Sequence, residues 1–266
     1  MARVITITSG KGGVGKTTTT ANLGTALAMR GSRVVVIDAD IGLRNLDVVM
    51  GLENRIVYDL VDVVEGRARL RQALIKDKRL PELCLLPAAQ TRDKDAVSPG
   101  QMAELTNQLR AEFDFVLIDS PAGIEGGFRN AISGADEVII VTTPEVSAVR
   151  DADRIVGLVE AAEKGPPSLI VNRIKPRLVN RGEMLSVDDV LELLAINLVG
   201  IVPDDETIVT STNRGEAAVY DQGSLAGKAF LNIARRLHGE EVPFPALTDQ
   251  PGVLERLMGM FGRRRP

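Results

Sequence analysis

The sequence predicts an α/β fold: a doubly wound, mostly parallel sheet with helices on both faces, which makes three layers. Short apolar runs rich in β-branched residues alternate with amphipathic stretches, as in a sheet whose strands are joined by helices. Glycine or charged residues directly follow several runs, at the edge where such sheets bind ligands. The 266 residues, 44% of them hydrophobic, suit one large domain of this kind.

Seven runs are expected to be buried strands, and the stretches between them to be helices. The runs at 34–37, 83–86 and 115–118 are apolar throughout rather than alternating, as in strands covered on both faces. The strands are predicted at residues 4–8, 34–37, 83–86, 115–118, 138–142, 169–172 and 198–202. The helices are predicted at residues 16–30, 98–112, 145–163, 186–195 and 224–238.

The segment between the first strand and the first helix carries the strongest chemical signal. Residues 10–17 read Gly-Lys-Gly-Gly-Val-Gly-Lys-Thr, which is the phosphate-binding pattern G-x-x-x-x-G-K-[ST] in a strand–loop–helix context. Its glycines let backbone N–H groups turn inward, Lys16 adds charge for the β- and γ-phosphates, and Thr17 offers a hydroxyl to Mg²⁺. A P-loop NTPase fold is therefore expected. The nucleotide is expected to contact Gly10, Lys11, Gly12, Gly13, Val14, Gly15, Lys16, Thr17 and Thr18.

Lys11 is the unusual residue of this loop, because one lysine is enough to reach the phosphates from inside. The segment resembles the deviant Walker A motif of the ParA/MinD family of ATPases. This resemblance implies ATP and Mg²⁺ as cofactors and a homodimer when ATP is bound. It also implies that Lys11 crosses to the partner's ATP and acts in catalysis together with Lys16 and Asp40.

Aspartates follow two of the predicted strands. The second strand ends in Asp38-Ala-Asp40, and two carboxylates at this spacing leave a strand end on the same side. Asp119 ends the strand at 115–118, which is a Walker B pattern. The resemblance implies that Asp38 supports the Mg²⁺ shell, that Asp119 binds Mg²⁺ through water, and that Asp40 acts on the attacking water. ATP hydrolysis is expected to be slow without an activating partner.

Two further segments resemble the switches of the family. Residues 38–47 read Asp-Ala-Asp-Ile-Gly-Leu-Arg-Asn-Leu-Asp, which is typical of the MinD branch, and Asn45 is expected to orient water or contact the partner subunit. Gly123 is expected to reach the γ-phosphate through its backbone N–H.

The resemblance also implies that Asn172 and the loop Pro203-Asp204-Asp205 hold adenine. Ordinary turn chemistry explains the two aspartates of this loop equally well.

The last residues predict a linker at 243–252 and an amphipathic helix at 253–266, after an ATPase domain at 1–242. The helix has an apolar stripe and ends in a basic cluster, which suits a helix lying among anionic lipid headgroups. The residues expected to contact the membrane are Val253, Leu254, Leu257, Met258, Phe261, Arg263, Arg264 and Arg265. A helix docked on the protein core and an arginine tail binding nucleic acid are the alternatives.

The resemblance covers the whole chain and implies an ATPase that positions the bacterial division site. It is expected in the cytoplasm, reversibly bound to the cytoplasmic face of the membrane. The implied partners are the division inhibitor MinC, the activator MinE or an equivalent, and anionic lipids. A net charge of −4 and the absence of Trp argue against nucleic acid as a partner. A regulator of flagellar number and a ParA-type partition ATPase are the alternatives, whereas a single cysteine, Cys84, argues against an iron–sulfur protein.

Overall fold

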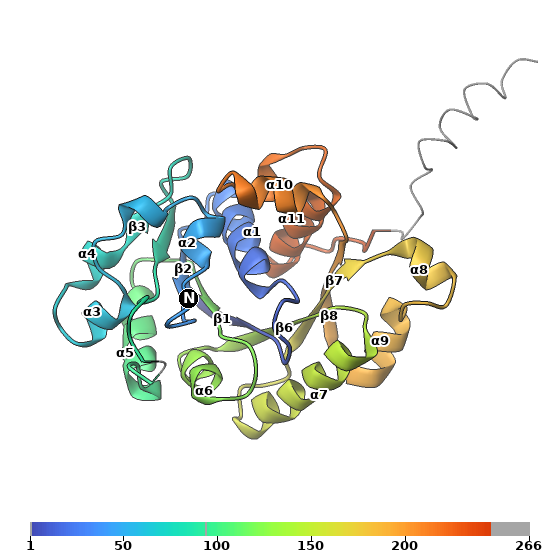
Figure 1. Cartoon of the computed structure of the whole chain (residues 1–266), viewed down its shortest axis with the longest axis horizontal. Helices are drawn as coiled ribbons and strands as arrows, with labels where there is room; N and C mark the ends of the chain where they lie inside the picture. The colour runs from blue at the N-terminus through green and yellow to red at the C-terminus, as the bar shows by residue number, and fades with distance from the viewer. Residues whose placement is uncertain (1, 94, 246–266) are drawn as a thin grey trace, which may run out of the picture.

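The computed structural model describes residues 2–93 and 95–245, and these residues form an eight-stranded sheet in the order β3-β4-β2-β5-β1-β6-β7-β8 (Figure 1). All neighbouring strands are parallel except β3, which pairs antiparallel with β4. The strands are β1 (Arg3–Thr8), β2 (Val34–Asp38), β3 (Ile75–Lys76), β4 (Leu83–Leu86), β5 (Phe115–Asp119), β6 (Glu137–Thr142), β7 (Ser168–Ile174) and β8 (Asn197–Pro203). The seven predicted strands are confirmed.

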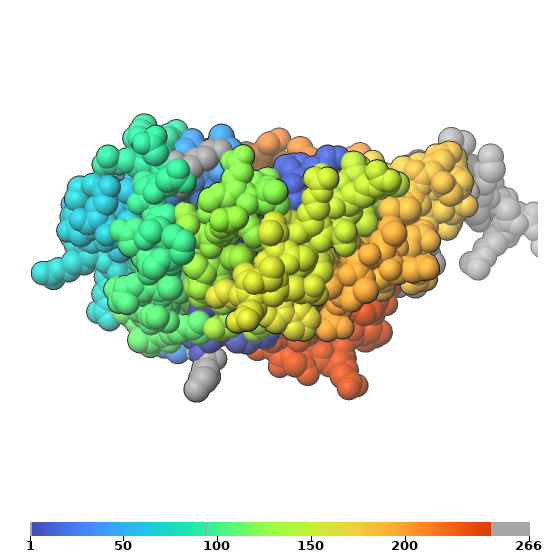
Figure 2. Space-filling view, turned by 90° about the horizontal axis from the view of Figure 1, so that it is seen from below, coloured from blue at the N-terminus to red at the C-terminus, as the bar shows by residue number. Residues whose placement is uncertain are grey.

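Helices cover both faces of this sheet, which confirms the predicted three layers. On one face lie α1 (Lys16–Met29), α2 (Leu46–Val49), α10 (Thr207–Asn213) and α11 (Leu225–Leu237) (Figure 1). On the other face lie α5 (Pro99–Leu109), α6 (Gly126–Ser133), α7 (Val146–Ala161) and α9 (Val187–Leu194), which run side by side (Figure 2). At the two ends are α3 (Leu60–Val64), α4 (Leu70–Ala73) and α8 (Pro176–Asn180).

Alternate residues of the central strands pack into different cores. Ile5 and Ile7 of β1 belong to the cluster formed with α1 and α11, whereas Val4 belongs to the cluster formed with α5. All three side chains are fully buried. Burial on both faces is the physical reason why the central strands are mostly apolar, and Thr6 and Thr8 of β1 are buried as well.

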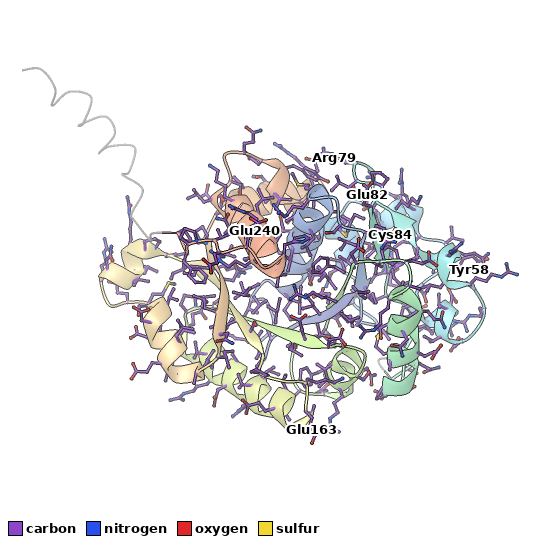
Figure 3. The ribbon with its side chains drawn as sticks, turned by 180° about the vertical axis from the view of Figure 1, so that it is seen from behind. Tyr58, Arg79, Glu82, Cys84, Glu163 and Glu240 are labelled. Atoms are coloured by element: carbon purple, nitrogen blue, oxygen red, sulfur yellow. The ribbon has the colours of Figure 1, made fainter. Side chains whose placement is uncertain are left out.

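The structure also contains elements that the sequence pattern does not predict. The edge strand β3 has two residues, too few to show a period, and α6 begins with the pair Gly126 and Gly127, which disfavours a helix on propensity alone. Cys84 lies on β4 and is a buried free thiol, as expected (Figure 3).

The predicted linker at 243–252 lies mostly outside the described residues, and the predicted membrane helix at 253–266 lies entirely outside them. Among the helices that the structure describes, none combines the length and apolarity needed to cross a bilayer.

Candidate nucleotide and magnesium site

The phosphate loop joins the end of β1 to the start of α1, where the N–H groups of the first helical turn are unpaired within the helix. Gly13 and Gly15 have φ of 78° and 99°, which only glycine adopts at low cost. Gly15 is also tightly enclosed, because a Cβ atom there would lie 2.4 Å from Nδ2 of Asn172. The loop therefore depends on glycine for both its conformation and its packing.

Lys16 begins α1, and its side chain points into the protein rather than to solvent. The residue is 8% exposed. Burial lowers the pKa of its ammonium group, and the charges of Asp119 and Asp40 oppose this fall. A buried cation in the field of two carboxylates lies at the mouth of a glycine-rich loop. This arrangement suits an anionic ligand.

Asp38 and Asp119 end neighbouring strands and are register partners in the β2–β5 ladder. Both are almost fully buried. Burial raises the pKa of Asp119, the charge of Asp38 raises it further, and a hydrogen bond with the Thr17 side chain opposes the rise. Burial likewise raises the pKa of Asp38. Two buried carboxylates this close favour a cation between or beside them.

The donor set fits Mg²⁺. Two carboxylates and the hydroxyl of Thr17 are hard oxygen ligands, and Mg²⁺ is bound in nucleotide sites by one or two carboxylates together with phosphate and water. Within residues 2–93 and 95–245 no group of three or more His, Cys, Asp or Glu side chains forms a metal cage. The residues present would therefore hold the ion only together with a phosphate ligand.

Backbone N–H groups of the predicted first switch hold the Asp38 carboxylate. Its Oδ1 accepts from Asp40 N at 3.0 Å, and its Oδ2 accepts from Asn45 N and Leu46 N, both at 3.1 Å. Asn45 itself is exposed.

In the second switch, Gly123 has a φ of 94° and its N–H donates to the Ser9 carbonyl at 3.2 Å. Contact between this N–H and a γ-phosphate would require that bond to be exchanged.

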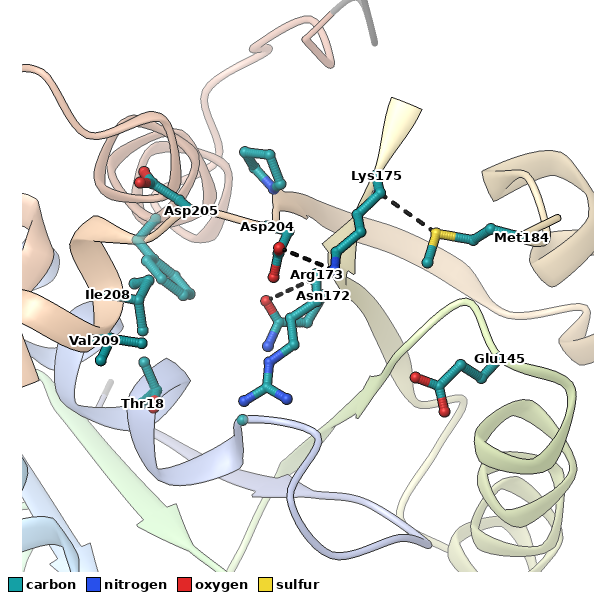
Figure 4. Close-up of a pocket in the computed structure, with 13 residues that line it drawn as sticks. Thr18, Glu145, Asn172, Arg173, Lys175, Met184, Asp204, Asp205, Ile208 and Val209 are labelled. Atoms are coloured by element: carbon teal, nitrogen blue, oxygen red, sulfur yellow. Dashed lines mark hydrogen bonds and ion pairs between the residues drawn. The ribbon is translucent and has the colours of Figure 1, made fainter. Parts of the chain in front are cut away.

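A pocket of about 410 Å³ opens beside the phosphate loop, at the carboxyl ends of β7 and β8 (Figure 4). The four residues predicted to hold adenine all line it: Asn172, Pro203, Asp204 and Asp205. Asn172 also braces the loop, because its Nδ2 donates to the Val14 carbonyl at 2.8 Å. Gly15 and Thr18 form the loop side of the pocket, so one continuous site joins it to the phosphate loop.

The two aspartates of the pocket loop have other partners. Asp205 Oδ2 accepts from Ala226 N at 2.9 Å and from the Ser224 hydroxyl at 2.8 Å, so this carboxylate caps the start of α11. Asp204 forms an ion pair with Lys175 at 3.3 Å. The turn and capping chemistry weighed for these residues is thus present, and their contact with adenine stays a prediction.

Several pocket residues gave no signal in the sequence. Arg173 adopts a left-handed backbone with φ of 57°, and its side chain extends from β7 toward the phosphate loop (Figure 4). Ile208 and Val209 of α10 and Phe230 of α11 supply apolar walls. Strained backbone at a non-glycine residue is enriched at ligand sites, but the strain is visible only in the folded chain.

Lys11 lies at the open edge of the loop, with its side chain 40% exposed. Its Nζ is 3.0 Å from the Ser147 hydroxyl and 3.3 Å from a carboxylate oxygen of Glu145, at the start of α7. In the single chain the lysine therefore turns away from α1, as expected, and rests on α7. Its contact with a partner's nucleotide stays a prediction.

Comparison with known proteins places this site in a family. The family model of the CobQ/CobB/MinD/ParA nucleotide binding domain matches residues 5–219. The septum site-determining protein MinD of Bacillus subtilis strain 168 is 57% identical over 99% of this chain and 100% of its own length. The chain belongs to the MinD family. Its phosphate loop thus lies within the nucleotide binding domain of that family.

Solved structures of the family agree with the fold. The MinC:MinD cell division protein complex of Aquifex aeolicus includes a chain that matches with a TM-score of 0.87 and 51% identity, covering 92% of this chain and 99% of that one. A septum site-determining MinD from Pyrococcus horikoshii, complexed with Mg-ADP, matches with a TM-score of 0.80 and 31% identity, covering 89% and 96%. The predicted P-loop ATPase fold and family are confirmed.

Proposed function

We propose that this chain is a Mg²⁺-dependent ATPase that dimerises on ATP, attaches reversibly to anionic membrane, and brings a division inhibitor there to position the division site. One observation carries the nucleotide part. Gly15 both lines the 410 Å³ pocket and precedes Lys16, which faces Asp119. An ATP whose base lies in the pocket would therefore place its phosphates along the loop and its terminal phosphate near the carboxylates.

The residues divide the chemistry among them. Lys16 and the loop N–H groups bind and orient the phosphates, while Thr17, Asp38 and Asp119 would hold Mg²⁺. When bound, the ion would neutralise charge on the phosphate oxygens. Asp40 would orient the attacking water and accept its proton. Because Lys11 of the single chain contacts Glu145, a second copy must release it before it reaches across. Hydrolysis is therefore slow without dimerisation and an activator.

The membrane part rests on the sequence of residues 253–266. One short amphipathic helix binds a bilayer weakly, but two helices on one dimer act together and strengthen attachment by orders of magnitude. ATP would thus control attachment through dimerisation, and hydrolysis would release the chain. The Aquifex relative is solved with MinC, which supports an inhibitor of that kind as the partner. An activator such as MinE or an equivalent completes the cycle.

Co-sedimentation with liposomes tests this proposal. The full chain should pellet with anionic vesicles in ATP and remain in solution in ADP, and a version ending at Gln250 should not pellet in either. Neutral vesicles are the control for charge. Equal pelleting in ATP and ADP would contradict nucleotide control, and pelleting of the truncated chain would contradict the role of the C-terminal residues.

A further inference from the structure

Arg44 lies in the loop that joins β2 to α2, and it has an unfavourable backbone conformation. Its φ is 45°, in the left-handed region, where a residue with a Cβ atom pays roughly 1–2 kcal/mol. The loop around it is closed by hydrogen bonds from Leu43 N and Arg44 N to the Asp40 carbonyl, both 3.2 Å. Something in the folded chain must hold Arg44 in this conformation.

The residue that holds it is Asp47, one turn further on in α2. Arg44 Nε lies 3.0 Å from Asp47 Oδ2. Asp47 is fully buried, and its carboxylate faces Arg44 and the backbone N–H groups of Val48 and of Asp47 itself. Loss of this carboxylate would leave the Arg44 charge without its buried partner. The pair therefore fixes the backbone conformation of the loop.

The two residues of the Arg44–Asp47 ion pair flank, in the sequence, the two residues whose N–H groups hold the Asp38 carboxylate. Asn45 and Leu46 lie between Arg44 and Asp47, and both of their N–H groups donate to Asp38 Oδ2. The backbone angles of Arg44 set the direction of the peptide that carries the Asn45 N–H. If Arg44 relaxed to the right-handed region, this N–H would turn away from the carboxylate.

We propose that Asp47 is a positioning residue for magnesium: through Arg44 it fixes the backbone that orients Asp38 toward Asp119. This inference rests on the proposed nucleotide function. Asp47 does not touch the ion or the nucleotide. It acts through one side chain and two backbone N–H groups.

Asp47→Asn tests this inference, because it keeps the shape and removes the charge. The Mg²⁺ concentration for half-maximal ATP hydrolysis should rise about 10- to 100-fold, as when other outer groups that orient metal ligands are lost. ADP affinity in EDTA should stay unchanged, whereas the melting temperature in EDTA should fall because Arg44 loses its buried partner. Glu112→Gln is the matched control, since it removes a carboxylate from an exposed ion pair with Arg71 far from the site and should change none of these.

A second substitution tests whether Asp47 acts through the backbone of Arg44. In the Asp47→Asn background, Arg44→Gly should recover most of the lost magnesium response, because glycine adopts a positive φ without a partner. A wild-type magnesium response in Asp47→Asn would overturn the inference, as would a double variant no better than the single one. An ADP affinity in EDTA that falls together with the magnesium response in Asp47→Asn would also overturn it, because the substitution would then have disturbed the whole site. A wild-type chain that binds neither ATP nor ADP would instead overturn the proposed function.

Discussion

Replacing Gly15 by alanine perturbs a residue that belongs to both the phosphate loop and the pocket. Gly15 has a φ of 99°, and an alanine with this backbone conformation would destabilise the fold by roughly 1–2 kcal/mol. The new Cβ atom would also lie 2.4 Å from Nδ2 of Asn172, so the amide must move and its hydrogen bond to the Val14 carbonyl breaks. Leaving these buried groups unpaired costs about 1–3 kcal/mol more.

Urea unfolding of the chain without nucleotide measures this loss, and Gly182→Ala is the matched control. Gly182 has a similar positive φ of 70°, but a Cβ atom there meets nothing within 4 Å. Its substitution should therefore cost only the backbone part. The difference between the two variants isolates the contact with Asn172 and should be about 1–3 kcal/mol.

A double-mutant cycle completes the test. In an Asn172→Ala background the obstructing amide is absent, so Gly15→Ala should cost no more than Gly182→Ala costs in the wild type. Equal losses for Gly15→Ala and Gly182→Ala in the wild type would refute the reasoning from the close approach. So would a Gly15→Ala loss that is the same with and without Asn172.

Three further outcomes are expected. Asp205→Ala should destabilise the chain by about 1–2 kcal/mol in urea unfolding, as for other lost helix caps. Burial raises the pKa of Asp205, but hydrogen bonds from Ala226 N and neighbouring groups lower it overall. The stability that this carboxylate contributes should therefore be present above about pH 4 and be lost as the pH falls through the folded-state pKa. An effect of Asp205→Ala that stays constant into acid would contradict the capping role. Asp119→Asn should abolish ATP hydrolysis yet raise the melting temperature in EDTA. The folded state of the wild type binds a proton on Asp119 that the unfolded state releases above about pH 4, so the stability of the wild type falls as the pH rises. A lower melting temperature of Asp119→Asn at pH 8 would contradict this reasoning. Lys11→Ala should leave monomeric ADP binding intact and abolish ATP-dependent dimerisation in light scattering, and a variant that still dimerises would remove the trans role.

Much of the fold could be predicted because its strands are buried on both faces. Val34–Asp38 and Phe115–Asp119 read as apolar runs ending in aspartate, and the structure pairs those two aspartates in register. The two-residue strand β3 has no such pattern. The glycine pair at the start of α6 has a low helix propensity, and the tertiary packing of Phe128 and Ile132 overrides that preference.

The site could be predicted where one local segment carries the chemistry, as in residues 10–17. It could not be predicted where distant segments meet. Phe230 reaches the pocket only because α11 packs against α1 and β8, and Ile208 reaches it from α10, which packs against α2. The left-handed backbone of Arg44 and its buried partner Asp47 depend on the same tertiary packing, and arginine has no preference for that conformation.

The pocket draws its lining from both ends of the chain, since Gly15 and Phe230 face the same cavity. During synthesis the phosphate loop leaves the ribosome first, and more than two hundred residues follow before the last wall of the pocket is made. A nascent chain that stops short of α11 carries the loop but lacks one wall of the pocket in which we propose that the base binds. Under that proposal, nucleotide would stabilise a chain made as far as α11 rather than a shorter one. Tight nucleotide binding would thus report that the chain has been made and folded at least that far.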